Sequence, residues 1–170
     1  MAHSDSAPEL VDRFKLAFRD HPLAVTLITA TTPEGPVGLT ASSVSSVAID
    51  PPAVSFSVTR ATGTAGALLR ADNLQIHFLA PEHVDTARQF SFTGGERFTD
   101  GQGWSYDESG ALQLAGSRGR LTGTIRDTLS VGGSVLVIAK IDAVDPGSSA
   151  QPLIYSDRAF HAFDSGHAPL

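Results

Sequence analysis

The 170-residue sequence contains no cysteine. This absence excludes disulfide bonds, thiolate zinc sites, iron–sulfur clusters and cysteine nucleophiles. The sequence also lacks an apolar run close to the roughly 20 residues that a membrane helix needs, and residues 1–9 lack the basic and apolar regions of a signal peptide. We therefore expect a soluble, cytoplasmic protein that has no membrane partner.

Basic residues are few as well. Lysine and arginine number 12 against 18 aspartates and glutamates, which gives a formal charge of −6 at pH 7. No block of basic residues is present, so we expect no nucleic-acid partner. The hydrophobic share of 41% is sufficient for a core, and the length suits one domain over residues 1–170. Flexible tails are expected at residues 1–7 and 164–170.

Helical patterns are limited to three segments. Residues 8–20 repeat their apolar side chains at helical spacing, and the His21-Pro22 pair ends this pattern, because a residue that precedes proline avoids the α region. The apolar face of this helix comprises Leu10, Val11, Phe14, Ala17 and Phe18. Shorter helices are predicted over residues 64–71 and 81–91.

Most other segments have strand patterns. The predicted strands cover residues 23–31, 37–47, 53–58, 74–80, 117–125 and 134–144, with a short extended piece within residues 152–163. The sequence PEGP at residues 33–36 predicts a turn that joins the first two strands into a hairpin. Residues 134–144 are almost continuously hydrophobic, so we expect burial on both faces. Short strands with few helices predict a mainly β fold, a β-barrel, and disfavour a Rossmann fold.

Residues 37–47 carry many small hydroxyl side chains, which suit a strand interior poorly. Such a strand leaves amides and hydroxyls open to a planar heterocycle or a phosphate, but composition alone favours an edge strand with serines in solvent. Residues 58–64 combine hydroxyls, Arg60 and Gly63 before a predicted helix. That arrangement suits an anion, although a simple N-cap by Thr62 or Thr64 explains it too.

Other chemistries have little support. None of the six histidines forms an HExxH pair, and no GxSxG sequence is present, so neither a metal site nor a hydrolase is expected. Asp107 and Glu108 are interpreted as a solvated turn rather than a catalytic pair. Trp104 is interpreted as a structural or interface residue.

Several stretches resemble the flavin reductase-like FMN-binding family. The sequences GLTASSVSSV at residues 38–47 and DPPAVSFSV at residues 50–58 are similar to the signature of that family. ARQF at residues 87–90 with GERF at residues 95–98 resembles its second helix and flavin-side loop. PLIYSDRAF at residues 152–160 resembles its closing motif. The resemblance runs from about residue 14 to residue 163, which we take as the core of the domain.

The resemblance implies a split β-barrel of the FMN-binding type that forms a homodimer and holds FMN or FAD at the subunit interface. The reaction it implies is hydride transfer from the nicotinamide C4 of NADH or NADPH to flavin N5, with reduced flavin supplied to a partner monooxygenase. One alternative is a flavin-binding carrier, sensor or electron-transfer module without efficient nicotinamide turnover. Another is a split barrel that holds a planar cofactor such as haem through His77 or His83.

The resemblance also assigns residues to the cofactor. The segment along the flavin ring and ribityl chain comprises Thr40, Ala41, Ser42, Ser43, Val44, Ser45 and Ser46. The phosphate is received by Ala61, Thr62, Gly63 and Thr64, with Arg97 and Phe98 close by. Tyr155 and Arg158 are expected at the nicotinamide side or the cofactor edge. No catalytic acid or base is expected, because the flavin carries the chemistry and the protein supplies position.

Three positions depart from the family pattern. Gly133-Ser134 stands where many members have Asp-His, a histidine associated with nicotinamide binding, so this change concerns the nicotinamide step rather than the flavin site. His77 stands where relatives often have asparagine, and it is expected either to face the cofactor or to be half-buried. The basic stretch SRGR at residues 117–120 is interpreted either as a contact for a nicotinamide phosphate or as a solvated strand start.

Overall fold

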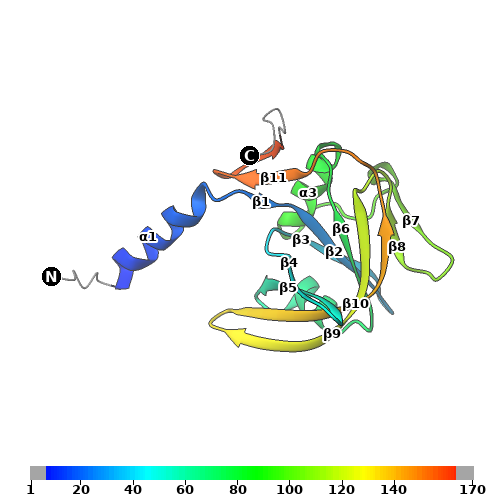
Figure 1. Ribbon diagram of the computed structural model, residues 1–170, viewed down its shortest axis with the longest axis horizontal. Helices are drawn as coiled ribbons and strands as arrows, with labels where there is room; N and C mark the ends of the chain where they lie inside the picture. Colours follow the sequence, from blue (N-terminus) through cyan, green and yellow to red (C-terminus); the bar gives the residue numbers. More distant parts are fainter. Residues whose placement is uncertain (1–6, 164–170) are drawn as a thin grey trace.

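A seven-stranded antiparallel sheet forms the body of the protein in the computed structural model, which describes residues 7–163 (Figure 1). The strands lie in the order β3-β2-β6-β9-β10-β5-β4. The prediction of a mainly β fold with a few short helices is confirmed. The strands are β2 (Thr26–Thr32), β3 (Gly35–Ala41), β4 (Ser45–Ile49), β5 (Pro52–Thr59), β6 (Leu74–Phe78), β9 (Gly119–Val131) and β10 (Ser134–Pro146).

The sheet curves around an apolar core and remains open at one place. Strands β3 and β4 are its two edges, and no pairing joins them within the described residues, so the barrel is split there. The extended stretch predicted over residues 37–47 is accordingly two strands, interrupted at residues 42–44. The predicted hairpin between β2 and β3 is confirmed. Buried residues that fill the core include Ile28, Phe56, Leu68, Leu74, Ile76 and Val137.

Helix α2 (Gly63–Leu69) closes one end of this core, since its Ala65 and Leu68 are buried in the same cluster as Phe56. Burial of a side chain such as Leu68 contributes roughly 1.5–3 kcal/mol. The alternation predicted for β5 is confirmed, because Val54, Phe56 and Val58 all face the core.

A second layer covers the outer face of β2 and β6. It consists of the 3-10 turn η1 (Pro81–His83), helix α3 (Val84–Ser91), the 3-10 turn η2 (Asp100–Gln102) and the hairpin of β7 (Trp104–Tyr106) and β8 (Leu112–Leu114). Phe90 of α3 and Leu27 of β2 are buried together in this layer. The polar alternate positions of β6 are therefore also inside, with Gln75 and His77 only 3% and 0% exposed. The β7–β8 hairpin lies where the sequence predicted no strand.

Strands β9 and β10 extend beyond the covered part of the sheet. Leu129 and Val131 of β9 are 60% and 61% exposed, while Leu136 and Val144 of β10 are 36% and 65% exposed. The expectation that residues 134–144 are buried on both faces is therefore wrong. A hydrophobic run shows only that a strand has little polar surface, and here part of that surface has no covering layer in this chain.

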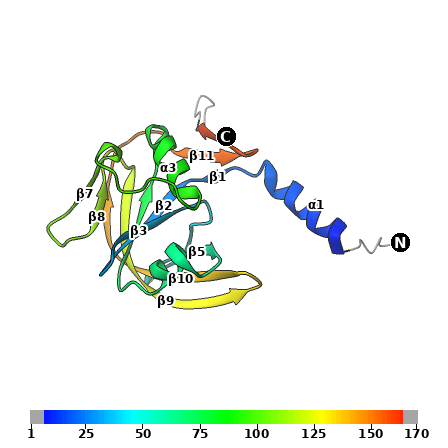
Figure 2. The ribbon, with the colours of Figure 1, turned by 180° about the vertical axis from the view of Figure 1, so that it is seen from behind.

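Helix α1 (Ala7–Arg19) extends away from the sheet in both ribbon views (Figures 1 and 2). The helix predicted over residues 8–20 is confirmed, but its apolar face is exposed, with Phe14 at 62% and Phe18 at 55%. A small sheet of β1 (Leu23–Ala24), β11 (Leu153–Ser156) and β12 (Ala159–Ala162) follows at its base. No helix within residues 7–163 is long and apolar enough to cross a membrane.

The predicted tails fall outside the described residues, except for residue 7, which begins α1. The single domain with a core at residues 14–163 stays a prediction.

Candidate functional site

The gap between β3 and β4 lies within the segment that the family resemblance places along the flavin. Residues 42–44 leave the strand ladder, so their backbone groups are not used in sheet pairing. Thr40 at the end of β3 donates its hydroxyl to the Ala87 carbonyl of α3, at 2.6 Å. The Ser43 hydroxyl accepts a hydrogen bond of 2.9 Å from the Ser57 amide of β5. Two neighbouring elements thus hold this open segment in place.

The remaining residues of this segment differ in accessibility. Ala41 is buried in the core, Ser42 and Val44 are half-buried, and Ser45 and Ser46 are exposed at the start of β4. Small side chains at the sheet opening leave room for a flat ligand to approach the backbone closely. The interpretation of residues 37–47 as an ordinary edge strand with solvated serines does not account for the break at residues 42–44.

The segment predicted to receive a phosphate forms the turn between β5 and α2. Ala61, Thr62 and Gly63 are exposed, and Gly63 has φ +55°, a left-handed conformation that favours glycine. Thr62 occupies the N-cap position, but its side chain makes no capping hydrogen bond, so the N-cap interpretation is not supported there. The hydroxyl of Thr64 instead accepts a hydrogen bond of 3.1 Å from Arg97 Nη1.

Arg97 is held firmly beside this turn. Its Nη2 donates to the Phe92 carbonyl at 2.6 Å, and its guanidinium carbon lies 5.6 Å from the centre of the Phe90 ring. Its Nε is buried and has no partner in the described part of the chain. A guanidinium next to a hydroxyl and an exposed turn supplies donors of the kind that bind a phosphate. The residues present therefore fit the phosphate group of a flavin nucleotide.

A hollow of about 440 Å³ lies between β3, α3 and the β11–β12 hairpin. It brings together four of the residues predicted from the sequence: Thr40, Ser42, Tyr155 and Arg158. A second hollow, of about 390 Å³, continues from it along α1 and shares Ser42, Tyr155 and Arg158 with the first. The turn at residues 61–64 lines neither hollow, so Thr64 and Arg97 form a separate polar centre.

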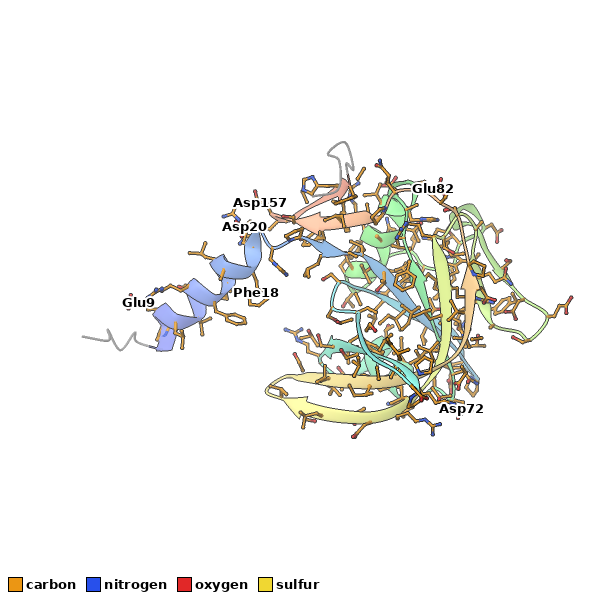
Figure 3. All side chains as sticks on the ribbon, in the orientation of Figure 1. Glu9, Phe18, Asp20, Asp72, Glu82 and Asp157 are labelled. Atoms are coloured by element: carbon orange, nitrogen blue, oxygen red, sulfur yellow. The ribbon has the colours of Figure 1, made fainter. Side chains whose placement is uncertain are left out.

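Tyr155 and Arg158 are positioned by the tight β11–β12 turn. Its two central residues, Asp157 and Arg158, have φ values of 45° and 61°, which is the left-handed geometry of two-residue hairpin turns. Asp157 Oδ1 accepts a 2.6 Å hydrogen bond from Arg19 Nε at the base of α1, and Figure 3 shows Asp157 at this junction. The Tyr155 ring packs 5.1 Å from that of Phe160.

Phe98 lies close to the flavin-side loop but serves the packing. Its ring contacts those of Phe90 and Trp104 at centroid distances of 5.0 and 5.1 Å. It also has φ +58°, which is uncommon outside glycine, so tertiary packing imposes its conformation. The expectation that Trp104 is structural agrees with this aromatic cluster.

Five residues that line the first hollow received no role from the sequence: Val25, Arg88, Ser91, Ala159 and Phe160. Arg88 and Ser91 lie one turn apart on α3 and are exposed, whereas Ala87 and Phe90 are buried. The sequence shows this amphipathic pattern, but it does not tell which elements the polar side chains of α3 face.

The histidines considered as ligands are both buried inside the protein. His77 Nε2 lies 3.0 Å from the Thr29 hydroxyl, and burial lowers the pKa of His77 to about 3, with Arg120 and His83 adding to the effect. His83 accepts from the Ala80 amide and contacts the Ala115 carbonyl at 2.9 Å. The expectations that His77 faces the cofactor or is half-buried are wrong, and nothing in this arrangement favours haem.

The basic stretch at residues 117–120 serves the fold. Arg120 is buried and donates to Asp145 Oδ2, to Asp107 Oδ2 at 2.7 Å and to the Leu112 carbonyl. Neither a nucleotide contact nor a solvated strand start describes Arg120, so both interpretations are wrong for it. Hydrogen bonds from Ser109 and Arg120 hold the pKa of Asp107 well below its usual range, so Asp107 is not a simple solvated turn residue.

Gly133-Ser134 lies in the turn of the β9–β10 hairpin, where the Gly133 carbonyl accepts a 2.9 Å hydrogen bond from the Arg60 amide. Neither residue lines the hollow that contains Tyr155 and Arg158. Within one chain, the substitution at these two positions therefore leaves that hollow unchanged.

Comparison with known proteins agrees with this geometry. Residues 18–164 match the flavin reductase like domain. The NADH:FMN oxidoreductase of Rhodococcus erythropolis is 33% identical over 152 residues, which is 87% of this chain and 79% of that relative.

Two solved structures have the same fold. The flavin reductase domain protein of Arthrobacter sp. FB24 superposes with a TM-score of 0.82 at 28% identity, covering 94% of this chain and 97% of that one. The styrene monooxygenase flavin reductase of Pseudomonas putida S12 has a TM-score of 0.79 at 23% identity, with 92% and 99% of the two chains covered. The family match spans most of the sequence, and the chain belongs to the flavin reductase like family.

Proposed function

We propose that this protein is an NADH:FMN oxidoreductase, a flavin reductase. The observation that carries the proposal is the hollow in which Thr40 and Ser42, beside the break in the sheet, meet Tyr155 and Arg158. The segment that the resemblance places along the flavin and the β11–β12 hairpin both line this hollow, which suits a reaction between two stacked ring systems. The name of the Rhodococcus relative supports NADH and FMN as the pair of substrates.

Bound FMN would supply the electron acceptor for the hydride of NADH, so that NADH is oxidised to NAD⁺ and the flavin gains two electrons. The protein chain binds the flavin and orients it toward the nicotinamide. The opening at residues 40–46 gives the ring a backbone wall, and Thr64 with Arg97 binds the phosphate. The half-buried hollow limits the access of water to the place where the rings meet. No side chain is required to transfer a proton.

A variant at the phosphate centre tests the placement of the flavin. Arg97→Ala removes the donor beside Thr64, and a charge-assisted hydrogen bond is worth about 1.5–3 kcal/mol, so the KM for FMN should rise about tenfold or more. The KM for NADH should change little. Oxidation is followed by the loss of the reduced-nicotinamide absorbance. Arg126→Ala, on the exposed face of β9, is the matched control. An unchanged KM for FMN would contradict the assignment.

The same assay tests the choice of cofactors. FAD and NADPH are compared with FMN and NADH at equal concentrations, and we expect FMN with NADH to give the largest kcat/KM. The absence of NADH oxidation with either flavin would refute the reductase.

A flavin-binding carrier without efficient nicotinamide turnover is the second candidate. Gly133-Ser134 in place of Asp-His favours it, because the family associates that histidine with nicotinamide. Quenching of flavin fluorescence without NADH oxidation would select the carrier.

Two partners belong to the proposal. The fold likeness to a styrene monooxygenase flavin reductase supports a partner monooxygenase that consumes the reduced flavin.

The other partner is a second copy of this chain. The exposed apolar face of α1, with Phe14 and Phe18, and the exposed Leu129 and Val131 of β9 support this homodimer. Sedimentation should give the mass of a dimer, and Phe14→Glu should shift it towards the monomer.

A further inference from the structure

Two cationic centres lie on different sides of α3, and each is close to a different part of the candidate site. Arg97 lies with Thr64 and Phe92, beyond the carboxyl end of the helix. Arg88 and Arg158 line the 440 Å³ hollow. We propose that Arg88 and Arg158 bind the pyrophosphate of the nicotinamide dinucleotide, while Arg97 serves the flavin. This inference rests on the proposed function and assigns a role to Arg88, which the sequence left without one.

The two guanidinium groups come from different elements that line the hollow. Arg88 projects from α3, where its Nη1 lies 3.0 Å from Asp85 Oδ1 and its guanidinium carbon lies 5.8 Å from the centre of the Phe160 ring. Both contacts lie at the surface, since the side chains of Arg88 and Asp85 are 58% and 88% exposed, so the guanidinium can turn to a ligand. Arg158 lies in the constrained β11–β12 turn, so its backbone is fixed. Such preorganisation reduces the entropy that binding would cost.

The local charge favours an anion. Asp157, beside Arg158 in the turn, is paired with Arg19, and the pair of Arg88 with Asp85 is exposed to solvent, which weakens it. Arg158 itself forms no ion pair in the described part of the chain, so its charge is uncompensated in a protein whose net charge is −6. Lys15 and Arg19 line the adjoining hollow along α1. A pyrophosphate has two negative charges and an array of oxygens that two guanidinium groups bind with good geometry.

The rest of the hollow suits a nucleotide. The rings of Tyr155 and Phe160 provide an apolar surface, and Thr40, Ser42 and Ser91 provide hydroxyl groups. The hollows of about 440 and 390 Å³ share three lining residues, and together they fall in the size range of small-molecule sites. The nicotinamide can therefore lie towards Ser42 and the sheet opening, with the phosphates at the arginine pair.

The experiment compares two reductants. NADH contains a pyrophosphate, whereas dihydronicotinamide riboside delivers the same hydride without any phosphate. Arg88→Ala and Arg158→Ala should each raise the KM for NADH about tenfold, with little change in kcat. The KM values for dihydronicotinamide riboside and FMN should be unchanged in both variants. Arg88→Lys should recover only part of the loss, because lysine cannot bind two phosphate oxygens as a planar fork. Arg126→Ala is again the control.

Two results would overturn the inference. An equal rise in KM for both reductants would show a structural effect on the hollow. A rise in the KM for FMN alone would show that the arginine pair binds the flavin phosphate instead.

A binding measurement separates this inference from the proposed function. ADP retains the pyrophosphate, and its binding to the wild-type protein and to Arg88→Ala is measured by calorimetry. Binding that weakens about tenfold in the variant supports the arginine pair, even if the wild-type protein oxidises no NADH. Failure of the wild-type protein to bind ADP, or equal affinity in both proteins, refutes it.

Discussion

The buried imidazole of His77 should make the stability of this protein depend strongly on pH. The ring is fully buried, its Nε2 contacts the Thr29 hydroxyl, and its Nδ1 has no partner among residues 7–163. Burial lowers its pKa from 6.5 to about 3, whereas the unfolded chain restores the ordinary value. Between these pH values the unfolded chain binds more protons, so stability falls as the pH falls. The full effect amounts to about 5 kcal/mol.

The variant His77→Gln tests this reasoning. A glutamine amide reaches about as far as Nε2 of histidine, so the contact with Thr29 can be retained while the titration is removed. Urea unfolding, followed by the fluorescence of Trp104, gives the free energy of unfolding at pH 7.5 and pH 4.5. Between these pH values the wild-type protein should lose about 3 kcal/mol more than the variant, because only its imidazole becomes protonated on unfolding.

The control is His21→Gln, since His21 is exposed at the end of α1. Its unfolding free energy should follow that of the wild-type protein at both pH values. Equal losses in the wild-type protein and in His77→Gln would refute the assignment of a neutral, buried His77. A lower stability of His77→Gln that is the same at both pH values would show only a packing defect.

Two further predictions concern packing around the site. Arg120→Met leaves two aspartates without their shared partner and should lower the free energy of unfolding by about 2 kcal/mol; a loss under about 0.5 kcal/mol would contradict its structural role. Gly38→Ala places a Cβ 2.9 Å from the Phe90 ring and should cost about 2 kcal/mol and weaken FMN binding. Gly101→Ala, with open space around its Cβ, is the control; equal melting temperatures for the two variants would refute the close contact.

Sequence patterns predicted much of the local structure. The helix at the start of the chain and the β2–β3 hairpin follow from helical spacing and from the PEGP turn, which are properties of neighbouring residues. Residues 37–47 were less predictable, since the break at 42–44 arises where the two edges of the sheet approach without pairing. Strand β10 shows the same limit, because its hydrophobicity does not reveal where the covering layer ends.

Some residues of the candidate site were also predicted from the sequence, and others became apparent only in the structure. The family resemblance selected Thr40, Ser42, Tyr155 and Arg158, and the structure brings these four into one hollow. Arg88 was within the ARQF sequence but had no role there, because its place in one hollow with Arg158 depends on how α3 packs against β3 and the β11–β12 hairpin.

The order of residues alone was enough for the mainly β class, the early helix and the flavin-binding family, because these depend on local periodicity and on short motifs of side chains. Tertiary structure decided what surrounds each polar group. His77 was placed in a dry interior, Arg120 between two carboxylates, and Arg88 and Arg158 at the lining of one hollow. The physical reason is that burial and electrostatic pairing depend on contacts between residues far apart in the chain, and a pattern of neighbours contains no record of them.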